Sequence, residues 1–365
     1  QETEGYRTDV RVCNLSYLQT DWYVNQMKSQ AYESDPLPIS MEESQYGNKK
    51  REYAYILDRV DYPVSVKMAM DYFLSDDERT KTIPGYGKIN HLPTGELFID
   101  IDKEKILKSG IVPKGYEDKI VDRIDLSFKD KNTLILNDLA IIDLLSTNAE
   151  TGWKRPVYFA TTVDPSFFTE TDKYFMRTGM AYEVVPVKLE NTPGRYQVNT
   201  DKMYDNVMNK FVWGGIDVNP DIYLDETIRR MCYSYRIMFI DLIDQLIQEG
   251  KTDKALKALD YCMEKIPGDV VPHNYISLQL AMDYYFLKQN EKGKALLEKI
   301  ADSAIEYVTW INSLDNNKKR SVQRDYYYNE RALAEQAIPM FYRFGDEESG
   351  KKYLEKAALA GVDIN

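Results

Sequence analysis

The stretch LIDQLIQEGKTDKALKALDYCMEKIP, residues 242–267, has the pattern of two helices joined by a tight turn. Gly250 stands at the turn, because glycine adopts a left-handed backbone without strain. Small or apolar residues follow at helical spacing and a proline closes the stretch: Ala255, Leu259, Cys262 and Pro267. Small residues let two helices approach closely, so the stretch predicts a helical hairpin.

The same pattern recurs twice in the last third of the chain. Forty residues on, the first three equivalent positions hold Asn290, Ala295 and Lys299. A third copy follows a longer insertion and consists of Gly345, Gly350, Leu354 and Ala357. The spacings of 40 and 55 residues differ from the ~34 residues of an ideal tetratricopeptide repeat. The prediction is a tetratricopeptide-like, all-α domain over residues 226–365, with a plain helical bundle as the alternative.

Residues 191–225 have the composition of a connector. They contain the turn sequence Thr192-Pro193-Gly194, the pair Gly214-Gly215, and the breaker Asn219-Pro220. We therefore expect a domain boundary here, and the charge of the chain changes near it. There are 27 basic and 37 acidic side chains before residue 226, but 20 and 22 from there on.

Residues 1–190 alternate between strand-like and helix-like segments. The strand-like runs are Val10–Leu15, Tyr53–Leu57, Leu97–Ile101, Arg123–Phe128, Val157–Thr161 and Met180–Val187. Ser65 and Asp102 are placed to cap helices between them. Strands separated by helices favour an α/β domain with a Rossmann-like, mainly parallel sheet.

Composition and motifs exclude several kinds of function. A net charge of −12 disfavours binding to nucleic acid or anionic lipid. The sequence has no Walker A, GxSxG or HExxH motif, and its three widely spaced cysteines and two histidines disfavour a zinc site. We therefore expect no metal, no cofactor and no catalytic residue in this chain. It has no apolar run of ~18 residues and no initial Met, so we expect a processed or excised piece without a membrane span.

A ligand of the α/β domain is expected beyond the carboxyl ends of its strands. The polar residues at those positions are Asn14, Ser16, Thr20, Asp21, Thr161 and Thr162. Arg177 adds a planar guanidinium that could clamp an anionic group. The alternative for all seven is helix capping and turn formation.

Four blocks resemble one family of membrane proteins. They are RTDVRVCNLSYLQTDWYVNQM (7–27), WKRPVYFATTV (153–163), YFMRTGMAYEVVPV (174–187) and KFVWGGIDVNPDIYLDETIRRM (210–231). The chain is similar to the C-terminal extramembrane region of a Bacteroidetes family of multi-spanning proteins, formerly a domain of unknown function. That family is related to the protein O-mannosyltransferases of the GT-C type.

The resemblance implies a transmembrane domain before Gln1, a lipid-linked sugar donor, and a location at the periplasmic face of the inner membrane. The catalytic carboxylate of such enzymes lies in the membrane part, and no position of this chain matches it. The expected partners are the chain's own transmembrane domain and an acceptor or partner protein, with membrane contact only through the preceding region. The resemblance also places the first β-α unit before Gln1, which predicts a truncated or solvent-covered sheet edge beside Val10–Leu15.

The function expected from the sequence is therefore a non-catalytic, extracytoplasmic accessory domain that recognises an acceptor or partner protein. One alternative is a helical-repeat scaffold for protein–protein interaction unrelated to glycosylation. A further alternative is an α/β enzyme that binds a nucleotide or a sugar.

Overall fold

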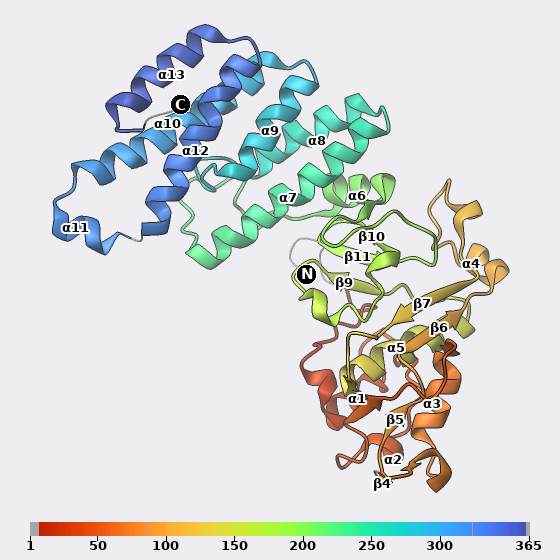
Figure 1. Ribbon diagram of the computed structural model, residues 1–365. Helices are drawn as coiled ribbons and strands as arrows, with labels where there is room; N and C mark the ends of the chain where they lie inside the picture. Colours follow the sequence, from red (N-terminus) through yellow and green to blue (C-terminus); the bar gives the residue numbers. More distant parts are fainter. Residues whose placement is uncertain (1–6, 86, 323, 363–365) are drawn as a thin grey trace. The chain divides into compact units, whose positions relative to one another are not determined.

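A computed structural model describes residues 7–85, 87–322 and 324–362, and these divide into two units between Asn199 and Thr200 (Figure 1). Every strand of the described residues belongs to the first unit, and the second consists of helices and loops. Part of the expected connector, from Thr200 onward, belongs to the second unit. There Trp213 stacks on Phe239, with ring centroids 5.8 Å apart.

The first unit combines short strands with five α-helices. Its helices are α1 (Asp21–Met27), α2 (Glu43–Tyr46), α3 (Val66–Leu74), α4 (Lys103–Ser109) and α5 (Leu136–Glu150). Its strands are β1 (Tyr53–Ile56), β2 (Val64–Ser65), β3 (Thr82–Ile83), β4 (Gly87–Lys88), β5 (His91–Leu92), β6 (Glu96–Asp100), β7 (Arg123–Ser127), β8 (Thr133–Ile135), β9 (Tyr158–Ala160), β10 (Phe175–Arg177), β11 (Ala181–Val184) and β12 (Gln197–Val198).

These strands form four small sheets rather than one. Their orders are β5-β1-β8, β12-β10-β11-β9, β2-β6-β7 and β3-β4. The pairs β1/β5, β10/β12 and β2/β6 are parallel, and the other five pairs are antiparallel. The prediction of a Rossmann-like, mainly parallel sheet is therefore not confirmed, although a mixed α and β unit is observed.

A short connection explains the antiparallel pairing of β10 and β11. β10 and β11 are joined by three residues, with Gly179 at φ 147°, and Arg177 pairs with Tyr182 across the turn. A parallel pair needs a crossover of a dozen or more residues, so a turn this short allows only an antiparallel hairpin. The sequence stretch 174–187 contains both strands of this hairpin, but the expected elements included only one of them.

The segment Val10–Leu15 is not a strand in the structure. The guanidinium of Arg11 donates to the carbonyls of Gln26 and Ser29, at 3.4 and 2.5 Å, which ties the segment to the end of α1. The side chains of Val10 and Val12 are exposed. The predicted truncated sheet edge beside this segment is therefore not found, because no strand exists there to form it.

Helix α5 forms the centre of the first unit. Twelve of its fifteen residues are buried, and it packs against α3, β6 and β8. A helix that is buried on nearly all sides belongs to a core rather than to a surface. Its buried Asp143 accepts hydrogen bonds from the backbone N–H and the hydroxyl of Ser40, both at 2.6 Å, and so fixes the loop before α2.

The second unit contains eight α-helices among its described residues. They are α6 (Thr200–Asp205), α7 (Glu226–Gln248), α8 (Thr252–Lys265), α9 (Tyr275–Phe286), α10 (Asn290–Ser313), α11 (Asn316–Ser321), α12 (Arg324–Arg343) and α13 (Glu347–Leu359). Three pairs follow one another as hairpins, α7/α8, α9/α10 and α12/α13 (Figure 1). The additional helix α11 accounts for the longer insertion before the third pair.

Each hairpin turns through one residue with a left-handed backbone. These residues are Gly250, Lys288 and Gly345, at φ 72°, 59° and 80°. In each hairpin the second helix begins two residues later. Lys288 is thus the structural equivalent of Gly250, and the predicted alignment of the second copy, which used Asn290, is two residues late.

This shift changes which residues pack between the helices. In the second copy Ala295 and Lys299 are exposed, whereas Gly293 and Leu297 are buried. The first copy packs as expected, with Ala255, Leu259 and Cys262 fully buried and Pro267 two residues after α8. In the third copy Gly350 and Ala357 are buried, but Leu354 is 38% exposed and its neighbour Tyr353 fills the core instead.

We predict that Gly293→Val lowers the free energy of unfolding by about 1–3 kcal/mol, the usual cost of overpacking. A Cβ atom at this position would lie 2.8 Å from the ring of Tyr285 and 3.2 Å from the carbonyl of Ala281. The Tyr285 ring cannot easily retreat, because it stacks on Phe344 with centroids 3.9 Å apart. Urea unfolding followed by circular dichroism measures the loss.

The matched control for Gly293→Val is Ala295→Val on the same helix. Ala295 is exposed, so this change should cost only the difference in helix propensity, about 0.5 kcal/mol. A larger loss for Ala295→Val than for Gly293→Val would mean that the register described for α10 is wrong.

Candidate binding groove

The polar residues expected to bind a ligand near the start of the chain serve the local turn. The Asn14 side chain accepts from the Tyr17 N–H at 3.1 Å, and the Thr20 hydroxyl donates to the Tyr17 carbonyl at 2.7 Å. Asp21 accepts from the N–H of Asn48 at 3.0 Å. Ser16 is exposed and precedes a short 3-10 helix.

The other three expected ligand residues belong to a different part of the first unit. Thr161 and Thr162 follow β9, and Arg177 ends β10, with β11 between the two strands. Arg177 is buried, and its Nε donates to the carbonyl of Gly179 at 3.1 Å. Its guanidinium also lies over the ring of Tyr182, 5.9 Å from the centroid. Because 10–15 is not a strand, the structure does not bring the two groups to one edge of a parallel sheet.

Candidate nucleophiles and bases are packing groups. Burial raises the pKa of the Cys262 thiol to about 12 and that of Cys13 to about 11, which leaves both as unreactive thiols near neutral pH. Burial lowers the pKa of His273 to about 3, and its imidazole lies 3.1 Å from the Ser277 hydroxyl. His91 is fully buried and pairs with the Tyr72 hydroxyl at 2.9 Å.

No group of three or more His, Cys, Asp or Glu side chains suited to a metal ion exists among the described residues. Residues 7–85, 87–322 and 324–362 therefore offer no evident metal centre.

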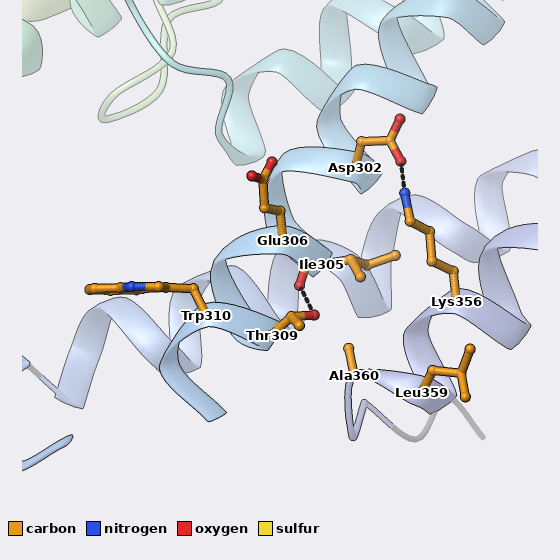
Figure 2. A pocket seen from close by; sticks show the side chains of 8 residues that line it. All are labelled: Asp302, Ile305, Glu306, Thr309, Trp310, Lys356, Leu359 and Ala360. Atoms are coloured by element: carbon orange, nitrogen blue, oxygen red, sulfur yellow. Dashed lines mark hydrogen bonds and ion pairs between the residues drawn. The ribbon is translucent and has the colours of Figure 1, made fainter. Parts of the chain in front are cut away.

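The second unit carries an open groove of about 680 Å³ between α10 and the end of α13 (Figure 2). Eight residues line it: Asp302, Ile305, Glu306, Thr309, Trp310, Lys356, Leu359 and Ala360. Ile305 and Ala360 are buried and form its floor. The small side chain of Ala360 leaves room above the floor.

Helix length creates this groove. α10 has 24 residues and its hairpin partner α9 has 12, which at ~1.5 Å per residue are ~36 and ~18 Å long. The second half of α10 therefore extends beyond α9, and the contacts there come from α12 and α13. The residues Asp302, Glu306 and Trp310 follow at intervals of four along this half and form one stripe.

One of the two carboxylates of the groove is already neutralised. The ammonium of Lys356 reaches from α13 to Asp302 on α10 (Figure 2). The Tyr353 hydroxyl also donates to Asp302, at 3.0 Å. Burial, together with the charge of Asp302, raises the pKa of Tyr353, so its hydroxyl stays a donor. Glu306 is exposed, and within the described part of the chain no side chain or backbone group pairs with its carboxylate.

Two large apolar side chains that line the groove are open to water. Leu359 is 91% exposed at the end of α13, and Trp310 is 48% exposed. Trp310 extends from α10 away from Leu359 (Figure 2). The Thr309 hydroxyl is satisfied by the Ile305 carbonyl at 2.7 Å. The groove thus offers an apolar floor, one unpaired carboxylate and an indole face, which suit binding rather than catalysis.

Comparison with known proteins identifies the family. A family model described as TMEM260-associated domain 2 matches residues 1–202, more than half of the 365 residues. The chain belongs to the TMEM260-associated domain 2 family. No curated protein and no solved structure matches the chain. The part matched by the TMEM260-associated domain 2 model ends close to the division between the units, so the groove lies outside it.

None of the helices in the described ranges is both long enough and apolar enough to cross a bilayer.

The residues that line the groove were not predicted from the sequence. Two features of the sequence could have indicated them. Glu306 and Trp310 are four residues apart on a long helix, and Leu359 is an apolar residue at the end of the last helix.

Proposed function

We propose that this chain is the extramembrane, non-catalytic accessory part of a larger membrane protein related to the GT-C protein O-mannosyltransferases of Bacteroidetes. In this proposal the sugar-transfer chemistry lies in a transmembrane domain, and the chain lies at the periplasmic face. The helical unit recognises the acceptor or partner protein. The observation that carries the recognition role is the open groove at the end of the third helical hairpin.

Three observations support the accessory role. The family match is to a domain associated with a membrane protein by its description. The four sequence blocks that resemble the mannosyltransferase-like family lie in both units. The buried thiols and histidines of the described residues are positioned by packing, and burial moves their pKa values away from those of a working nucleophile or base.

We also propose that the three hairpins are tetratricopeptide-like repeats. Their left-handed turns and buried small residues, Ala255, Gly293 and Gly350, at five residues after each turn, support this reading. Stacked helical hairpins present extended surfaces that bind peptides and proteins.

The test compares the full-length membrane protein with a variant that lacks residues 200–365. Mannosyl transfer from a polyprenyl-linked donor is measured to a folded acceptor protein and to a short acceptor peptide. We expect transfer to the folded protein to fall while transfer to the peptide persists, because only recognition is lost. Unchanged transfer to both acceptors would contradict the recruiting role and favour a scaffold whose partner is unrelated to glycosylation.

A further inference from the structure

We infer that the groove between α10 and α13 binds a short peptide segment of the partner in which a lysine or arginine neighbours a large apolar side chain. This inference rests on the proposed recognition role and specifies the chemistry of what is recognised. Three features of the groove carry it: its charge, its apolar surface and its length.

The charge of the groove selects a cation. Its only lysine, Lys356, is engaged by Asp302, so Glu306 remains as an unpaired carboxylate. Trp310 follows Glu306 by four residues and therefore lies beside it on the same face of α10. A lysine or arginine side chain placed there contacts the carboxylate and the indole face together, which is a favourable setting for a cation. The same carboxylate repels acidic peptides, nucleic acid and anionic lipid.

The apolar surface selects the neighbouring side chain. The floor consists of Ile305 and Ala360, and Leu359 on the rim is 91% exposed to water.

 The exposed Leu359 side chain loses its contact with water when an aliphatic or aromatic residue of the partner packs over it and onto this floor. Burial of one such side chain should raise the affinity about tenfold or more.

The length of the groove selects a short segment. From Asp302 to Trp310 the stripe spans eight residue intervals of helix, or ~12 Å at ~1.5 Å per residue. An extended peptide advances ~3.3–3.6 Å per residue, so three or four residues span this distance. The recognised segment is therefore three or four residues long and contains one apolar and one basic residue.

The test probes the complete chain, residues 1–365, against an array of synthetic hexapeptides. Each peptide carries Leu or Phe next to Lys, Arg, Ser, Asp or Glu. We expect the chain to retain the Lys and Arg peptides at least about fivefold more strongly than the Asp and Glu peptides at low salt. Glu306→Lys should reverse this preference. The matched control is Glu355→Lys, which makes the same charge change at an exposed position of α13 outside the groove and should leave the preference intact.

A second pair of variants tests the apolar contact. Leu359→Ala should weaken binding of the Leu-Lys peptide about tenfold, whereas Leu354→Ala, on the same helix but outside the groove, should leave it unchanged. Leu359 is so exposed that its removal does not threaten the fold.

Two results would overturn the inference, and they differ in what they mean for the proposed function. Peptides that bind without a basic preference, or equally well to Glu306→Lys, would place recognition at another surface and leave the recruiting role standing. Retention of no peptide would remove the groove as a peptide site, and the transfer assay with the 200–365 deletion would then decide the recruiting role by itself.

Discussion

Asp283→Asn is expected to stabilise the helical unit by on the order of 2–4 kcal/mol at pH 8. Asp283 lies on α9 and is fully buried. One carboxylate oxygen accepts from the Gln279 side chain at 2.8 Å, and the other has no hydrogen-bond partner. Burial raises the pKa of Asp283 to about 7, and the nearby charge of Asp244 adds to the rise. Asparagine resembles the protonated carboxyl in shape and carries no charge.

The stabilisation by Asp283→Asn should depend on pH. The pKa of Asp283 in the folded chain lies above its ordinary value of 3.8, so the protonated side chain contributes stability that is complete below about pH 4. That contribution is lost as the pH rises through 7. The variant and the natural chain should therefore be nearly equal in stability at pH 4 and should diverge up to pH 8.

Thermal unfolding of both proteins between pH 4 and 8, followed by far-ultraviolet circular dichroism, measures this divergence. A difference that is the same at every pH would show that Asp283 does not titrate in this range.

Arg236→Met is expected to destabilise the helical unit by about 3–5 kcal/mol. Arg236 lies on α7 and is fully buried. Its guanidinium donates to the carbonyls of Pro272, Ile266 and Val271, at 2.9, 3.1 and 2.5 Å. These carbonyls belong to the loop that connects α8 to α9, and methionine would leave them buried without a donor.

Two further variants separate the roles of the buried arginine. Arg236→Lys keeps the charge but lacks the planar fork, so it should lose part of the stability. Arg229→Met, at an exposed position of the same helix, should change the free energy of unfolding by less than about 0.5 kcal/mol. Urea unfolding measures all three. Equal stability of Arg236→Met and the natural chain would mean that the desolvation of the guanidinium offsets its hydrogen bonds.

Features set by neighbouring residues could be predicted from the sequence. Ser65 and Asp102 cap α3 and α4 with their side chains, and Gly110 ends α4 in the left-handed region. Gly250 forms the turn of the first hairpin, as expected for glycine. These features depend on the backbone preferences of a few adjacent residues, which the sequence states directly.

Features set by distant contacts could not be predicted. Lys288 adopts the left-handed turn of the second hairpin, although lysine has no preference for it, so Asn290 was the better candidate by composition. The direction of strand pairing depends on which strands meet, and the local pattern of residues 174–187 does not reveal the hairpin.

The groove could not be predicted for a similar reason. It results from the difference in length between α9 and α10 and from the approach of α13. Neither is visible in the residues that line it. The expected ligand residues Asn14 and Thr161 lie on different elements because the strand that was to align them is absent.

Hydrogen–deuterium exchange of the complete chain with and without the Leu-Lys hexapeptide tests most directly whether recognition resides in the helical unit. The account predicts slower exchange at residues 302–310 and 356–360, and no change at residues 14–21 and 161–177. Protection confined to 14–21 and 161–177 would contradict it and would place the binding site in the first unit.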